Sequence, residues 1–207
     1  MRVYSALILF CFLQTLMCDV SLNTTQLLQT YNNSLKYIKA FHPSPFSVRG
    51  PKNAGNTFTL TSLSLDYADL TDKNAKFTID EFGVLHVKYT NLKLTLKGSY
   101  PISTIRSLRY STSFTATLSN VTFEFIYGIA SKQLEDGKHE FKFGLTSESG
   151  VTFKLTKFTS SKQVTSATVT FETSARSQVR KVDFTPLKNH FKKVTQLIFD
   201  EFNGKKN

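Results

Sequence analysis

Two long stretches of alternating apolar and polar residues shift their alternation by one position, and these shifts constrain the fold more than any other feature. In LHVKYTNLKLTLKGSYP, residues 85–101, the apolar positions change from odd to even numbers between Tyr89 and Leu92. A similar change occurs at Ser119 and Asn120 within residues 110–129, and a third lies within residues 58–67. The extra residue of a β-bulge returns the apolar side chains to the same face and bends the strand. The pattern therefore predicts long antiparallel strands in a strongly curved sheet.

Amphipathic helices are predicted at both ends of this strand region. Residues 24–41 and 185–202 each carry apolar side chains at helical spacing, and in the second segment Thr185 is expected as the cap and Pro186 in the first turn. Turns are expected around GSYPISTI, residues 98–105, and at residues 135–137 and 149–150, where they would close hairpins.

The order of these elements predicts an α+β fold. A long, highly curved antiparallel sheet would wrap around the C-terminal amphipathic helix, with an additional N-terminal helix. A lipocalin-like barrel is the alternative, but it needs neither helices at both ends nor strands of this length.

The first residues have the pattern of a secretory signal. Met1 to Cys18 combines a positive start at Arg2, the apolar run ALILFCFL and a small residue before the expected cut. We therefore predict a secreted, extracellular protein with one domain at residues 19–207. Cys11 and Cys18 are the two cysteines, so removal of this segment leaves no thiol for a disulfide, a zinc-thiolate site or a cysteine nucleophile. Three sequons give candidate glycosylation sites at Asn23, Asn32 and Asn120.

The formal net charge of +11 indicates anionic partners. For an exported protein these are membranes, glycans and bacterial surfaces rather than nucleic acids.

Enzyme chemistry has little support in the sequence. The four histidines have no metal-ligand spacing, and His86 alternates with Leu85 and Val87, so it is expected to point away from the core. GPKNAGNT, residues 50–57, lacks the lysine of a phosphate-binding loop, and no GxSxG motif is present. We predict no catalytic residue, no metal and no cofactor.

A first helix is followed along the chain by FTLTSLSLDYADL, VLHVKYTNLKLTLKGSYP, LRYSTSFTATLSNVTFEF and a closing LKNHFKKVTQLIFDEF. This order resembles the amino-terminal domain of the bactericidal/permeability-increasing (BPI/LBP) family, within the tubular lipid-binding (TULIP) superfamily. The resemblance spans roughly Gln26 to Asn203. It implies a rolled sheet around the closing helix, an apolar tunnel for acyl chains, and a basic tip that meets lipopolysaccharide phosphates. The chain lacks two features of the family. One is the cysteine pair that fixes the last helix, and the other is the second domain. Closure of the tunnel and oligomeric state therefore stay open.

These features give two predicted sets of site residues. Inward-facing side chains are expected to line the apolar site, with filled core as the alternative: Leu92, Leu94, Leu96, Phe114, Phe123, Phe125, Phe191, Leu197 and Ile198. Basic residues near strand ends are expected to meet an anionic headgroup, with ordinary solvated loops as the alternative: Arg49, Lys52, Lys93, Lys97, Arg106 and Arg109. Lys188, Lys192 and Lys193 are expected to be solvated.

The predicted function is binding or carriage of lipid or another elongated hydrophobic molecule. One alternative is a defence or membrane-active protein that binds lipopolysaccharide or anionic membranes. A second alternative is a surface-active secreted protein without a specific ligand.

Overall fold

The computed structural model describes residues 22–40, 58–66, 70–104, 108–160 and 175–205, and it describes side chains in these ranges except at 36–40 and 101–111. The elements are α2 (Thr24–Ala40), β1 (Thr59–Leu65), η2 (Asp72–Asn74), β2 (Ala75–Ile79), β3 (Leu85–Thr104), β4 (Leu108–Gln133), β5 (His139–Glu148), β6 (Thr152–Ser160) and α4 (Thr185–Phe202), with a short helix at 175–179. The predicted signal segment and the segment GPKNAGNT at 50–57 lie outside the described residues.

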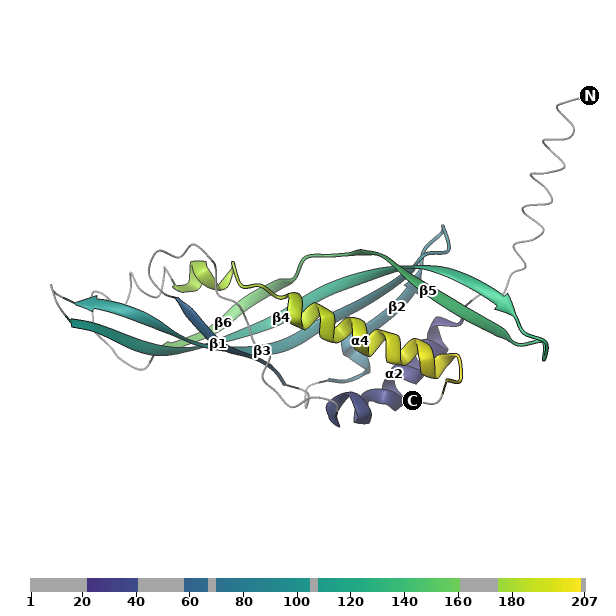
Figure 1. Ribbon diagram of the computed structural model, residues 1–207, viewed down its shortest axis with the longest axis horizontal. Coiled ribbons are helices and arrows are strands. Elements are labelled where there is room, and N and C mark those ends of the chain that lie inside the picture. The colour runs from purple at the N-terminus through teal and green to yellow at the C-terminus, as the bar shows by residue number, and fades with distance from the viewer. Residues whose placement is uncertain (1–21, 41–57, 67–69, 105–107, 161–174, 206–207) are drawn as a thin grey trace, which may run out of the picture.

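The sheet consists of two long central strands with two shorter strands along each outer edge. β3 and β4 pair from Leu85 with Tyr127 to Thr104 with Leu108. β1 and β2 lie end to end along β3, and β5 and β6 lie end to end along β4 (Figure 1). The hairpin predicted at Ser149 and Gly150 is therefore wrong, since the chain continues in one direction from β5 to β6. Alternation indicates which face a side chain occupies, but not which strand is its neighbour.

The predicted shifts of alternation are confirmed as β-bulges. The pairing register changes on both sides of Leu92 in β3 and between Leu60 and Ser62 in β1. Asn91 and Asn120 have φ angles of 56° and 52°, a left-handed conformation that asparagine tolerates better than most residues. The buried amide of Asn74 donates a hydrogen bond to the Thr90 carbonyl at 3.0 Å, which satisfies an acceptor beside the bulge. The apolar residues on either side of each bulge consequently share one face.

The turn predicted at GSYPISTI is wrong, because β3 continues through it to Thr104. Pro101 lacks a backbone N–H, which a strand between two neighbours would need. The pairing of β1 with β3 begins at Ser99, so Pro101 lies beyond β1, and among the described strands its partner is β4, at Ser111. Proline is therefore accommodated in this strand without losing a sheet hydrogen bond on the β1 side.

The predicted bounds of the C-terminal helix are confirmed, and α4 lies along one face of the curved sheet (Figure 1). Thr185 is not its cap, however, because Phe184 occupies that position. The Asp183 carboxylate accepts a hydrogen bond from the Thr185 N–H at 2.9 Å instead. Contacts join α2 to α4 and to β2. The chain thus has the predicted α+β architecture: a half-barrel sheet with a C-terminal and an N-terminal helix.

Charged side chains attach α4 to the end of β5. Lys188 Nζ lies 3.0 Å from Glu148 Oε1, and Lys192 forms a second ion pair with the same carboxylate. Hydrogen bonds from Lys192 and then Lys188 lower the pKa of Glu148. The prediction that Lys188 and Lys192 are solvated is therefore wrong, whereas Lys193 is exposed.

Two further polar contacts attach α4 at its middle and its end. The hydroxyls of Tyr89 and Thr195 are 2.7 Å apart, and both residues are fully buried. At the C-terminus, Asn203 accepts a hydrogen bond from the Phe141 N–H at 3.0 Å and donates one to the Phe141 carbonyl at 2.8 Å. Polar contacts along its length therefore hold the helix, in a domain whose residues 19–207 contain no cysteine.

Candidate functional site

The predicted apolar residues of the sheet all lie on its concave face. The six strand residues are at most 2% exposed: Leu92, Leu94, Leu96, Phe114, Phe123 and Phe125. From α4, Phe191 and Ile198 are fully buried, while Leu197 is only half-buried. The structure thus brings the sheet residues and two of the three helix residues into one apolar interior.

Under α4, this interior is packed with aromatic rings. The centroid of the Phe191 ring lies 4.5 Å from that of Tyr89 and 4.9 Å from that of Phe123, and Phe123 and Phe125 are 5.3 Å apart. Such offset and edge-to-face pairs stabilise the fold beyond area burial alone. These rings therefore form core contacts at this level of the sheet, and a role in ligand binding stays a prediction for them.

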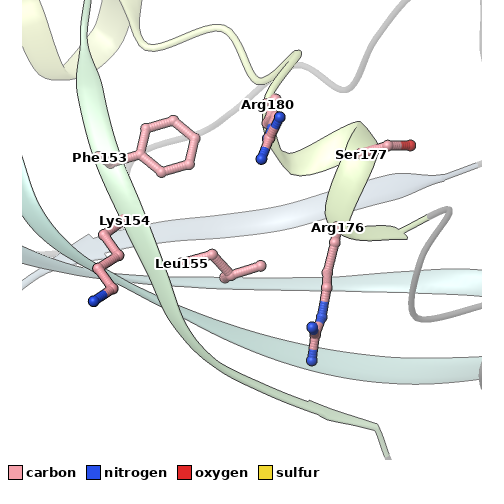
Figure 2. Close-up of a pocket in the computed structure, with 6 residues that line it drawn as sticks. All are labelled: Phe153, Lys154, Leu155, Arg176, Ser177 and Arg180. Atoms are coloured by element: carbon pink, nitrogen blue, oxygen red, sulfur yellow. The ribbon is translucent and has the colours of Figure 1, made fainter.

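A cavity lies farther along the sheet, between β6 and residues 175–180, which comprise the short helix and the turn residue after it. It has a volume of about 640 Å³, which is within the range of small-molecule sites. Six of the described residues line it (Figure 2): Phe153, Lys154, Leu155, Arg176, Ser177 and Arg180. The sequence pattern assigns none of these residues to a site. The apolar side chains at 153 and 155 were visible as alternation, but nothing local indicated that the segment after residue 174 returns over β6.

The β6 wall of the cavity is apolar and continues into the core. Phe153 and Leu155 project from β6 toward the short helix, while Lys154 points to the other side of the strand (Figure 2). Leu155 pairs in register with the fully buried Leu118, and the Phe153 ring lies 5.4 Å from that of Phe184. A ligand on this wall would therefore contact side chains that are continuous with the buried interior.

The opposite wall of the cavity is basic. Arg176 lies in the short helix and Arg180 directly follows it, and the Arg180 guanidinium lies on the side that faces Phe153 (Figure 2). Arginine keeps its positive charge throughout the physiological pH range. Among the described residues that line the cavity there is no carboxylate, and three of them, Lys154, Arg176 and Arg180, are basic.

The predicted headgroup residues are not brought together by the described part of the chain. Arg49, Lys52 and Arg106 lie outside it, and so does the side chain of Arg109, which is in β4. Lys93 and Lys97 are exposed on the face of β3 opposite Leu94 and Leu96. Their predicted position beside a turn is wrong, because the strand runs past both of them.

The candidate glycosylation residues are all exposed. Asn120 is at a bulge, and Asn32 lies in α2. The Asn23 side chain accepts a hydrogen bond from the Gln26 N–H at 3.1 Å, at the start of α2. The asparagine of each sequon is therefore accessible to solvent, and glycosylation at these sites stays a prediction.

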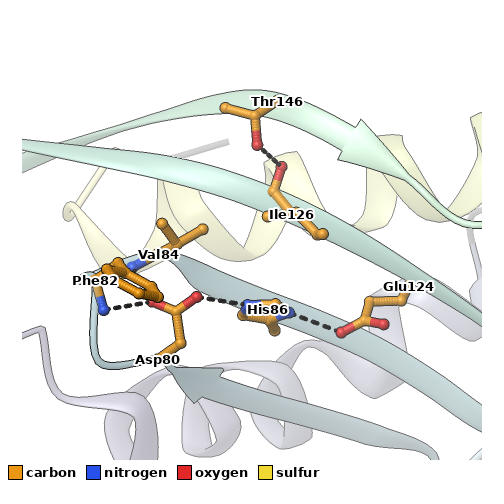
Figure 3. Close-up of polar contacts among 7 residues, drawn as sticks. All are labelled: Asp80, Phe82, Val84, His86, Glu124, Ile126 and Thr146. Atoms are coloured by element: carbon orange, nitrogen blue, oxygen red, sulfur yellow. Dashed lines mark hydrogen bonds and ion pairs between the residues drawn. The ribbon is translucent and has the colours of Figure 1, made fainter.

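His86 points away from the core, as predicted, and it lies between two carboxylates (Figure 3). Its Nδ1 is 2.8 Å from Glu124 Oε1, and its Nε2 is 3.0 Å from Asp80 Oδ2. Hydrogen bonds to Asp80 and then Glu124 raise the pKa of His86. The pKa of Asp80 is lowered, first by the Val84 N–H and then by His86. Because both ring nitrogens are engaged, we interpret this cluster as a structural contact between the β2–β3 turn and β4.

Among the described residues, no group of three or more His, Cys, Asp or Glu side chains is arranged to hold a metal ion. Within the same ranges, no helix has both the length and the apolar character needed to cross a bilayer. No protein-family model matches the chain, and no curated protein matches it closely enough to count as a relative. The site must therefore be interpreted from its own geometry.

Proposed function

We propose that this protein is a secreted, single-domain binder or carrier of lipid or another elongated apolar ligand. The observation that carries the proposal is the cavity beside β6, whose apolar wall at Phe153 and Leu155 continues into the core. Each methylene group moved from water onto such a wall contributes about 0.8 kcal/mol. The resemblance of the chain to the BPI/LBP family and the TULIP superfamily supports the same function.

Identification of the ligand that copurifies with the protein tests this proposal. The full chain would be expressed through a secretory route, purified without detergent, and extracted with organic solvent for mass spectrometry. We expect a lipid or another long apolar molecule at close to one per protein. Protein that carries none, and that fails to bind added lipid after extraction, would contradict the proposal.

A substitution in the β6 wall should weaken binding. Leu155→Gln places a polar amide on the apolar wall, so we expect the affinity for a neutral fluorescent long-chain alcohol to fall roughly five- to tenfold. Fluorescence titration measures this. Leu145→Gln is the matched control, since Leu145 is 44% exposed on β5 and does not line the cavity. Equal affinities of the two variants for the alcohol would show that the β6 wall is not part of the binding site.

A second candidate function is contact with anionic membranes. The turns at 80–84 and 134–138 lie toward the same end of the molecule (Figure 1), and they expose Phe82 to 81% and Leu134 to 40%. Together with a net charge of +11, exposed apolar side chains favour adsorption to anionic lipid. Flotation with vesicles of anionic phospholipid would show binding that weakens steeply with added salt. Salt-independent binding, or none, would exclude this function.

A further inference from the structure

The end of α4 is formed by Asn203-Gly204, which is the one Asn-Gly pair in the sequence. Gly204 has a φ angle of 72°, a left-handed conformation that favours glycine. The Gly204 N–H donates a hydrogen bond to the Glu201 carbonyl at 2.9 Å, and the Lys205 N–H donates one to the Asp200 carbonyl at 2.8 Å. This pair of hydrogen bonds is the Schellman ending of a helix, in which the left-handed position is usually glycine. The end of α4 therefore requires glycine at position 204.

The fold also requires an amide at position 203. Asn203 accepts a hydrogen bond from the Phe141 N–H at 3.0 Å and donates one to the Phe141 carbonyl at 2.8 Å. A side-chain amide has both an acceptor and donors, whereas an ionised carboxylate only accepts. Asparagine therefore joins α4 to β5 through two hydrogen bonds, of which aspartate could keep only one.

These two requirements place a chemically reactive pair at the end of the helix. Glycine has no side chain to hinder the approach of its backbone nitrogen to the preceding carboxamide. The Gly204 nitrogen can attack Cγ of Asn203, so that a new N–C bond forms and the Cγ–Nδ2 bond breaks. The proton lost from Gly204 leaves with Nδ2 as ammonia. Water then opens the succinimide at one of its two carbonyls and gives aspartate or isoaspartate.

In the folded structure, hydrogen bonds hold both reacting groups apart from each other. Phe141 fixes the carboxamide, the Glu201 carbonyl accepts from the Gly204 nitrogen, and the Asn203 N–H donates to the Phe199 carbonyl at 3.1 Å. The attack therefore requires the last turn of α4 to open.

The product of the reaction cannot restore the contact with β5. In aspartate, an oxygen replaces Nδ2 opposite the Phe141 carbonyl oxygen, so two acceptors face each other without a proton between them. Isoaspartate in addition lengthens the backbone by one carbon atom.

We propose that Asn203 is a site of spontaneous deamidation, that opening of the last turn of α4 controls its rate, and that the modification permanently releases this end of α4 from β5. The site is separate from the cavity beside β6. Because α4 covers the concave face of the sheet, the modified protein uncovers one end of that face more readily (Figure 1).

The first test compares the folded and the unfolded chain. The full chain would be kept in mildly alkaline buffer with or without urea, and the peptide that contains Asn203 would be followed by mass spectrometry. We expect conversion to the acid to be about tenfold slower in the folded protein, because the reaction waits for a local opening that costs free energy. Equal rates in the two conditions would overturn the control by opening, and an unmodified Asn203 in urea would exclude the site.

Two variants in α2 test whether the end of α4 controls the rate. The Ser34 hydroxyl donates a hydrogen bond to the Glu201 carboxylate, which joins α2 to the last turn of α4. Ser34→Ala should speed the modification about three- to tenfold in the folded protein and leave the rate in urea unchanged. Thr30→Ala is the matched control, because the Thr30 hydroxyl donates to the Gln26 carbonyl within α2. Equal rates for the two folded variants would contradict the proposed control.

The effect of the modification is tested by Asn203→Asp, which has the side chain of one product. We expect hydrogen exchange in the last turns of α4 to become about tenfold faster in this variant. Asn189→Asp adds the same charge on the exposed side of α4 and should leave the exchange unchanged. Exchange in Asn203→Asp equal to that of the unchanged protein would show that the modification does not release the helix. None of these measurements involves a ligand, so their failure would leave the proposed function standing.

Discussion

At the scale of single residues, His86 makes the stability of the fold depend on pH. A neutral imidazole has one N–H, so it can donate to either Asp80 or Glu124, whereas the imidazolium donates to both. The raised pKa of His86 means that its stabilisation is fully present below about pH 6.5 and is lost as the pH rises through the folded value. The lowered pKa of Asp80 means that its contribution is lost only in acid. We expect the melting temperature of the protein to fall between pH 6 and 8.5, and His86→Gln to reduce that fall.

The matched control for this measurement is His139→Gln. No carboxylate pairs with His139 among the described residues, so this variant should keep the pH dependence of the unchanged protein. Identical pH profiles for the two variants would show that the contact of His86 with the carboxylates does not contribute.

At the scale of elements, one glycine lets the outer strands pack against the central pair. A Cβ atom at Gly98 would lie 2.5 Å from the Phe114 ring and 2.5 Å from the Thr59 carbonyl oxygen. The Phe114 ring is stacked between those of Phe58, at 5.0 Å, and Phe158, at 5.4 Å. Gly98→Ala must displace this stack, so we expect a loss of about 1–3 kcal/mol in the free energy of unfolding. Urea denaturation measures it.

Gly144→Ala is the control for Gly98, since nothing lies within 4 Å of its Cβ position in β5. Alanine costs less chain entropy than glycine, so this variant should be unchanged or slightly more stable. A loss of stability equal to that of Gly98→Ala would indicate a general cost of removing strand glycines rather than a clash.

At the scale of the whole molecule, polar contacts add to the buried apolar side chains in holding α4 over the concave face of the sheet. Asn203→Ala removes both hydrogen bonds to Phe141, so we expect a loss of about 1–3 kcal/mol in stability and faster hydrogen exchange in the last turns of α4. Denaturation and exchange monitored by mass spectrometry measure the two effects. Asn189→Ala, on the exposed side of α4, should change neither. Unchanged exchange in the Asn203 variant would mean that other contacts are sufficient to hold the helix.

The parts of the fold that depend on local pattern were predictable from the sequence. The three shifts of alternation indicated bulges, and the structure has changes of register at the same places. The apolar stripe of residues 185–202 gave the bounds of α4. The class of the fold followed, because a bent sheet with one apolar face needs a helix to cover it. The predicted site was only partly assembled: its apolar residues gather inside the sheet, whereas Lys93 and Lys97 lie outside.

The sequence by itself determined which residues face inward, where the long strands bend and where the last helix begins and ends, because these properties depend on neighbours within a few positions. Only the tertiary structure decided that β5 and β6 share one edge of β4, that His86 meets Asp80 and Glu124, and that Arg176 and Arg180 lie across from Phe153. These contacts join segments far apart in the chain or set one face against another. Alternation is the same for every choice of partner strand, so the pattern contains no information about them.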